Sequence, residues 1–93
     1  MAERPRVLSY VDARSGIRFV FMTEPTDPKM LHIYARSLTT VYDAVETFFE
    51  GQTRWNAEQE RLETFTDRFG LYWFWLEVDQ VVVVISCFRR EGA

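Results

Sequence analysis

The fold of this chain is decided by residues 70–88, which read GLYWFWLEVDQVVVVISCF. Two apolar runs rich in aromatic and β-branched residues flank a polar turn at Asp79-Gln80, and such residues suit a pleated, packed sheet. We therefore expect an antiparallel hairpin with strands at about residues 71–77 and 81–88. The second run is apolar at odd and even positions alike, which predicts an inner strand that is covered on both faces. Either the helices must lie on both sides of the sheet, or a second chain must cover one side.

Three more strands are expected upstream. Residues 7–12 and 17–22 read as a hairpin whose turn contains Gly16, a residue that can take a positive φ. Residues 61–67 read as another strand, followed by a turn at residues 68–70. The first hairpin should turn these side chains toward the core: Leu8, Tyr10, Ile17, Phe19 and Phe21.

A capping box marks the start of the clearest helix, with Thr40 as the cap and Asp43 as its partner. Apolar residues then recur at helical spacing along one stripe, namely Val41, Ala44, Val45, Phe48 and Phe49. We expect Gly51 to end this helix as a left-handed cap. Thr40 should be more important to stability than Thr39.

A shorter helix is expected over residues 28–36, because Asp27 followed by Pro28 is a helix-start signal. A strand is the alternative, since apolar and polar residues alternate from Leu31 to Arg36. Residues 52–60 are polar apart from Trp55 and Ala57. They read as a loop, with Asn56 able to cap one helical turn.

The predicted fold class is α+β: a β-hairpin, two short helices, then a three-stranded antiparallel meander, forming one sheet with the helices packed on it. The 93 residues suit a single domain spanning residues 1–93, with the polar residues 1–6 frayed.

The composition argues against several classes of function. The net charge of −3 argues against a protein held to nucleic acid by many phosphate contacts. One cysteine, Cys87, allows no intrachain disulfide and suggests a reducing cytoplasm, and one histidine is too few for a Cys/His zinc site. We find no signal-peptide pattern, no apolar run of about 20 residues, and no nucleotide, dinucleotide or metal motif. We therefore expect a cytoplasmic protein without a cofactor and without a membrane partner.

Two polar groups are candidates for catalysis. His32 and Arg36 form an i, i+4 pair, with Lys29 three residues earlier, and could serve as general acid or base and as phosphate clamp. A solvated helix face is the alternative. Trp55 and Asn56 stand near Glu60, Glu63 and Thr64. Paired carboxylates can do acid–base work when one pKa is raised, and a loop anchored by Trp55 is the alternative.

Aromatic and arginine side chains are candidates for binding. Strand alternation places Trp73 and Trp75 on one face of the sheet and Tyr72 with Phe74 on the other. If the tryptophan pair is exposed, it could be a binding hot spot; the alternative is that both faces are part of the core. The further candidates are Trp55 in its loop and Arg89 and Arg90 at the strand end. Cys87 should be an inert, buried thiol.

The leading functional hypothesis is a small non-catalytic protein-binding or dimerising module. Eight Phe, four Tyr and three Trp exceed what one small core hides, and a homodimer or a protein partner would cover the surplus. The interface should include Trp55 or a Trp or Tyr from residues 72–75. A specialised form would be an acidic inhibitor or immunity-type protein that blocks a basic partner.

The alternative hypothesis is an enzyme. A helix bearing His32 and Arg36, then a capped helix, then a meander ending in Arg89-Arg90, resembles small bacterial ribonuclease toxins of the RelE/ParE and barnase-like group. The resemblance covers the element order over residues 30–90 and no specific motif. It implies an acid or base at His32 and phosphate contacts at Arg36 and Arg89. That group is typically basic, whereas this chain is acidic.

Overall fold

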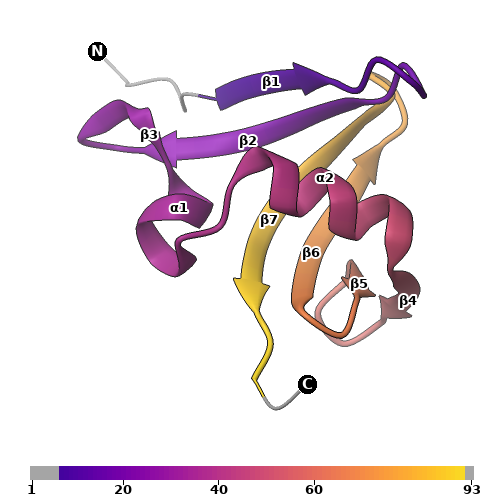
Figure 1. The fold of residues 1–93 in the computed structure, drawn as a ribbon. Coiled ribbons are helices and arrows are strands. Elements are labelled where there is room, and N and C mark those ends of the chain that lie inside the picture. Colours follow the sequence, from indigo (N-terminus) through magenta and orange to yellow (C-terminus); the bar gives the residue numbers. More distant parts are fainter. Residues whose placement is uncertain (1–6, 92–93) are drawn as a thin grey trace.

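The computed structural model describes residues 7–91 (Figure 1), so the expectation for residues 1–6 lies outside the described part. The elements are β1 (Val7–Val11), β2 (Arg18–Glu24), β3 (Asp27–Leu31), α1 (His32–Ser37), α2 (Val41–Glu50), β4 (Gln52–Asn56), β5 (Arg61–Phe65), β6 (Phe69–Leu76) and β7 (Val81–Arg89). The fold is a mixed α+β fold with one open sheet and two helices, as the sequence predicts.

The sheet has the strand order β1-β2-β7-β6-β5-β4, and β3 pairs with β2 off this path. All neighbours are antiparallel except β2 and β7, which are parallel. Both expected hairpins are present, and their turns contain positive φ angles at Gly16 (75°) and Gln80 (52°). The turn expected at residues 68–70 lies slightly earlier, because Phe69 and Gly70 already belong to β6.

The helix expected over residues 28–36 is half wrong. Residues 27–31 form β3, and α1 begins only at His32. Asp27 caps no helix, because its Oδ1 accepts a hydrogen bond from the backbone N–H of Lys29 at 3.0 Å, which fixes a local turn. The backbone from Asp27 to Leu31 then pairs with Thr23 and Glu24.

The loop expected over residues 52–60 is also half wrong, because residues 52–56 form the edge strand β4. Gly51 is extended, with φ −81° and ψ 173°, so it passes the chain directly from α2 into this strand instead of forming a left-handed cap. A Cβ at Gly51 would lie 2.6 Å from Thr64 Cγ2. Asn56 caps no helix; its Oδ1 accepts from the Gln59 N–H at 3.0 Å in the β4–β5 turn.

Both helices lie on one side of the sheet (Figure 1). The predicted capping box is present: Asp43 N–H donates to Thr40 Oγ1 at 3.2 Å, and Thr40 N–H donates to Asp43 Oδ2 at 2.9 Å. The core between helices and sheet contains Phe19, Phe21, Ile33, Ala44, Val45, Leu71, Trp73, Val82, Val84 and Cys87. The expectation that β7 is covered on both faces is not met by the described residues, since neither helix lies over the other face.

Candidate functional site

The uncovered side of the sheet, which we call the open face, is set by strand alternation. Phe19 and Phe21 point into the core, so Arg18, Val20 and Met22 of β2 point the other way. Cross-strand pairing then places Val7 beside Met22 and Val83 beside Val20 on this face.

The part of the open face formed by β1, β2, the start of β7 and the end of β6 is apolar and bare. Six large apolar side chains here are between 36 and 50 % exposed: Val7, Val11, Met22, Phe74, Leu76 and Ile85. We call these six residues, together with Val20 and Val83, the bare patch. Ile85 follows Val81 and Val83 on this face by alternation along β7. A bulge then interrupts the β6–β7 ladder, where Tyr72 pairs with Ser86 and Trp73 pairs with Val84, so Cys87 and not Ser86 points into the core. The extra residue in β7 explains why simple alternation does not place every side chain of residues 81–88.

The part of the open face formed by β4, β5, the start of β6 and the end of β7 carries aromatic rings covered by arginines. The Arg61 guanidinium carbon lies 3.7 Å from the centre of the Tyr72 ring, and those of Arg54 and Arg90 lie 5.1 and 4.9 Å from that of Phe65. Tyr72 also meets Phe88 edge to face at 5.0 Å. These contacts shield the aromatic side of the open face from water.

Glu63 anchors two of these arginines, Arg54 and Arg61, and is only 2 % exposed. Its carboxylate accepts hydrogen bonds from Asn56 Nδ2 at 3.0 Å, Arg61 Nε at 2.9 Å and Arg54 Nε at 3.3 Å. The Asn56 hydrogen bond, followed by those from the two arginines, holds the pKa of Glu63 below its ordinary value against the opposing effect of burial. The hydrogen bonds and the lowered pKa favour a structural anion at Glu63 over the acid–base role with a raised pKa that the sequence suggests.

The structure separates Trp55 from this carboxylate. Trp55 pairs with Leu62, on the helix side of the sheet, whereas Arg54 pairs with Glu63 on the open face. Trp55 is 57 % exposed at the edge strand. It remains available for binding, but it does not belong to a polar site with Glu63.

His32 and Arg36 do share a site. They line a hollow of about 510 Å³ where α1 meets the bare patch, and its floor contains Met22, Phe74, Val83 and Ile85. Glu24, at the end of β2, places Oε2 3.4 Å from His32 Nδ1. Sequence reasoning named the histidine and the arginine but missed this carboxylate, because only the β2–β3 hairpin brings it to α1.

The other predicted binding residues divide between core and surface. Trp73 is buried, and its indole N–H donates to Thr64 Oγ1 at 2.8 Å, so it is a core residue. Trp75 is exposed near the end of β6, while Tyr72 is half-buried under Arg61.

The terminal arginines and Cys87 have structural surroundings. Arg90 Nη1 donates to the Thr66 carbonyl at 2.6 Å, and the Arg89 guanidinium carbon lies 5.4 Å from the centre of the Phe69 ring. Cys87 is buried, as expected, and burial raises the pKa of its thiol to about 11, which disfavours the reactive thiolate.

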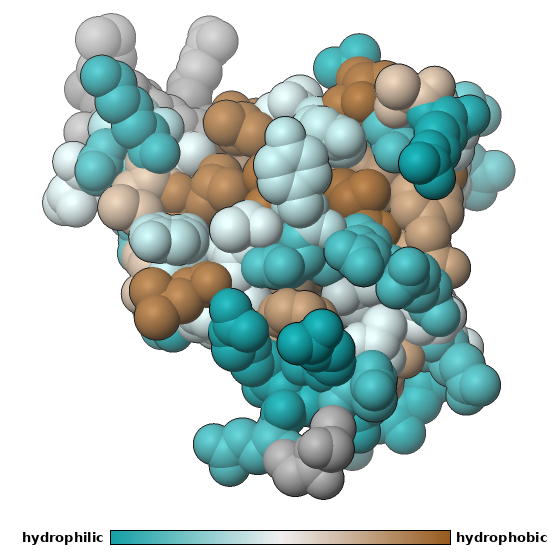
Figure 2. All heavy atoms as spheres, in the orientation of Figure 1, coloured by the Kyte–Doolittle hydropathy of each residue, from teal (hydrophilic) through white to brown (hydrophobic). Residues whose placement is uncertain are grey.

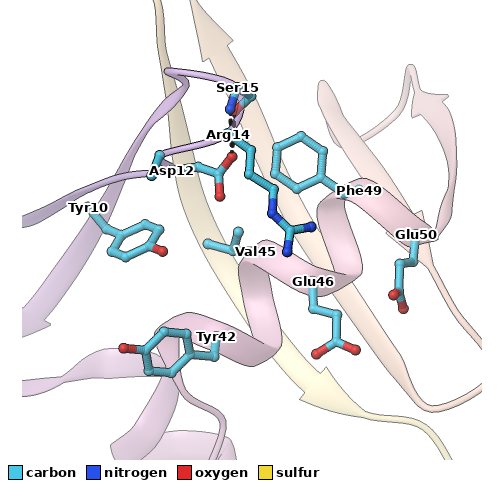
Figure 3. A pocket seen from close by; sticks show the side chains of 10 residues that line it. Tyr10, Asp12, Arg14, Ser15, Tyr42, Val45, Glu46, Phe49 and Glu50 are labelled. Atoms are coloured by element: carbon cyan, nitrogen blue, oxygen red, sulfur yellow. Dashed lines mark hydrogen bonds between the residues drawn. The ribbon is translucent and has the colours of Figure 1, made fainter.

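A second hollow, of about 710 Å³, lies on the helix side between the β1–β2 turn and α2 (Figure 3). Tyr10 and Tyr42 stand at one end of it, and Arg14 extends from the turn toward α2 (Figure 3). Asp12 fixes the turn by accepting from the Ser15 hydroxyl at 2.7 Å and from the Ser15 N–H at 2.9 Å. On this side of the molecule, apolar side chains gather in the upper part and hydrophilic ones in the lower part (Figure 2).

Residues 7–91 contain neither a metal-binding cluster nor a membrane-spanning helix. No three His, Cys, Asp or Glu side chains among them gather to hold a metal ion. No helix in the described part is long and apolar enough to cross a membrane. No protein-family model, no curated protein and no solved structure matches this chain. The likeness to ribonuclease toxins therefore rests on element order alone, and β4 interrupts that order between α2 and the meander.

Proposed function

We propose that this protein is a non-catalytic protein-binding module that docks on another protein through the bare patch. The observation that carries the proposal is the contiguous set of large apolar side chains left uncovered by both helices. Soluble proteins expose contiguous apolar patches mainly where they bind something. The shielded aromatic side of the same face shows that this sheet can cover its own rings, so the uncovered side is the better docking surface.

The charges around the bare patch favour a partner with carboxylates at the rim of its own apolar surface. Arg18 is exposed on the open face next to Val11, and Arg36 lines the hollow at the α1 end. Glu24 is already engaged by His32. Complementary charge at such a rim mainly sets the partner and the rate of association.

The narrower form of the proposal, an acidic inhibitor of a basic partner, would use α2 instead. Asp43, Glu46 and Glu50 line a hollow beside this helix. The two surfaces lie on opposite sides of the sheet, so a variant on each distinguishes them.

The test is capture of a partner from the source cell by the purified protein, read by mass spectrometry and repeated with purified partner. Phe74→Arg, in the bare patch, should abolish the specific interaction and leave the unfolding transition in place. Val78→Arg is the matched control, because Val78 is exposed in the β6–β7 turn and is not a member of the bare patch. Binding that survives Phe74→Arg, or that is lost equally in both variants, would contradict docking through the bare patch. Loss on Glu46→Lys alone would favour the inhibitor form.

A second candidate function is RNA cleavage, and the Glu24–His32 contact beside Arg36 favours it. A carboxylate that orients a histidine next to a phosphate-binding arginine is a workable acid–base arrangement. Expression of the protein should then arrest growth or cleave RNA, and His32→Ala should abolish the effect. Tyr34→Ala, at an exposed position of the same helix, is the control. Unchanged RNA in cells expressing the parent protein would remove this candidate.

A further inference from the structure

The two outer edges of the sheet are built differently. The β4 edge reads Gln52-Thr53-Arg54-Trp55-Asn56 and carries a charged residue among polar ones. The β1 edge reads Val7-Leu8-Ser9-Tyr10-Val11, without a charge, proline or glycine, and its pairing with β2 is regular over all five residues. Edge strands normally carry charges, prolines or bulges that prevent pairing with another chain. The β1 edge has none of these.

The hydrogen-bond pattern shows which backbone groups of β1 face outward. The Asp12 N–H donates to the Ile17 carbonyl at 2.9 Å, so this pair is hydrogen-bonded. Hydrogen-bonded and non-hydrogen-bonded pairs alternate along an antiparallel ladder. The N–H and C=O groups of Val7, Ser9 and Val11 therefore point away from β2, toward a side where β1 has no strand neighbour among residues 7–91.

Apolar side chains flank this edge on both faces of the sheet. Val7 and Val11 are exposed on the open face, and Leu8 is exposed on the helix side. Tyr42, 72 % exposed, stands next to Tyr10 on the helix side with a ring separation of 6.3 Å. A strand added to β1 would cover apolar groups above and below the new hydrogen bonds.

We propose that two copies of this protein join through their β1 edges, antiparallel about a twofold axis at Ser9. The strand is self-complementary in this register. Val7 would lie opposite Val11 of the partner subunit, Leu8 opposite Tyr10 of the partner subunit, and the two Ser9 residues opposite each other. Apolar side chains meet apolar ones, no charges are opposed, and the outward backbone groups of the odd residues meet as hydrogen-bonded pairs. The twofold closes the assembly at two copies, because each copy uses its β1 edge, the one edge strand among residues 7–91 without a charge or a proline.

This interface adjoins the bare patch, two members of which, Val7 and Val11, lie on the β1 strand. Val7 and Val11 lie at the margin where the two open faces would join. The dimer would therefore present one sheet with two bare patches side by side, and a partner could engage both copies at once.

Cross-linking tests the register. Ser9→Cys should form a disulfide-linked dimer under mild oxidation at micromolar concentration, because residues in a hydrogen-bonded pair have Cα atoms about 5.5 Å apart, within disulfide reach. Cys87 is buried and leaves the new thiol as the reactive one. Val11→Cys should cross-link far less with itself, but should pair with Val7→Cys when the two proteins are mixed. Equal cross-linking of Ser9→Cys and Val11→Cys, or no cross-linking of either, would overturn the proposal.

Light scattering tests the interface without oxidation. The parent should have twice the 11.1 kDa mass of one chain. Ser9→Lys should reduce that mass to one chain, because two ammonium groups would face each other across the axis. Gln52→Lys makes the same change on the β4 edge and should leave the dimer intact, as should Phe74→Arg in the bare patch. A monomeric parent, or a dimer that survives Ser9→Lys, would contradict the β1 interface. Dissociation of the dimer by Phe74→Arg alone would locate self-association on the open face and refute the β1 interface. If Phe74→Arg abolishes partner binding but leaves the dimer intact, that result bears on the proposed docking function and not on the β1 interface.

Discussion

The two faces of this sheet are stabilised in different ways. On the helix side, Phe48 stands between Phe19 and Trp73, with ring separations of 5.1 and 4.9 Å, and locks α2 onto β2 and β6. On the open face, arginines cover the aromatic rings beside Glu63, whereas the bare patch stays partly exposed and meets His32 and Arg36 of α1 at one hollow. The buried core therefore lies on the helix side, while the open face keeps large apolar side chains partly exposed.

The largest effect should come from the helix side. Phe48→Ala removes the ring that links α2 to the sheet, and we expect the free energy of unfolding to fall by about 3 kcal/mol. Urea unfolding followed by circular dichroism measures this. Phe49→Ala, at a more exposed ring on the same helix, should cost about 1 kcal/mol. Equal losses at the two sites would mean that α2 does not dock through Phe48.

The next effect concerns the connection between the helices. Thr39 is fully buried, and its hydroxyl lies 3.0 Å from the Cys87 carbonyl and 3.2 Å from the Ile33 carbonyl. We expect Thr39→Ala to cost about 2 kcal/mol and Thr40→Ala, which removes the helix cap, about 1 kcal/mol. Thermal and urea unfolding of both variants checks the ranking. The sequence alone ranks Thr40 above Thr39, and the structure reverses this order. A larger loss of stability for Thr40→Ala than for Thr39→Ala would support the order expected from sequence.

A smaller, pH-dependent effect is expected on the shielded side of the open face. The pKa of Glu63 is lowered in the folded state, so its carboxylate stabilises the fold fully above the ordinary glutamate value of 4.5 and loses this contribution as the pH falls through the lowered pKa. Glu63→Gln should therefore destabilise the protein at pH 7, and the difference from the parent should shrink in acid. Glu60→Gln, in the exposed β4–β5 turn, is the control and should show no such trend.

The smallest effect is expected in the bare patch. Phe74→Ser should change the free energy of unfolding by no more than about 1 kcal/mol, because the ring is not packed under a helix. The same variant should weaken partner binding. A loss comparable with that of Phe48→Ala would show that the open face contributes to stability as much as the helix side does.

The parts of the fold that follow from sequence are those with a strong local pattern. The hairpin of β6 and β7 follows from two uninterrupted apolar runs, and α2 follows from its capping box and apolar stripe. The sequence does not predict β4, because an edge strand needs no apolar face, and Gln52, Thr53 and Arg54 give no strand pattern. It does not predict β3 either, because Asp27-Pro28 can start a helix or form a turn, and here the Asp27–Lys29 hydrogen bond forms the turn.

Only part of the candidate site can be predicted from the sequence, for a related reason. His32 and Arg36 are neighbours on any helix, so sequence spacing pairs them. Glu24 reaches His32 only through the β2–β3 hairpin, and the bare patch exists only because β2 and β7 become neighbours. The parallel pairing of strands so distant in sequence leaves no signal in a single chain.

That parallel pairing also has a consequence for the order of events during synthesis. Phe19 pairs with Val82, so β2 must wait for β7 to be translated before its inner edge is occupied. Throughout that interval the β1–β2 hairpin carries Phe19 and Phe21 without their cover, and both of its edges are open. Contacts between such distant segments form slowly, and unpaired strand edges make nascent chains prone to aggregation. The newly made hairpin should therefore be the segment that most needs a chaperone while the rest of the chain is still on the ribosome.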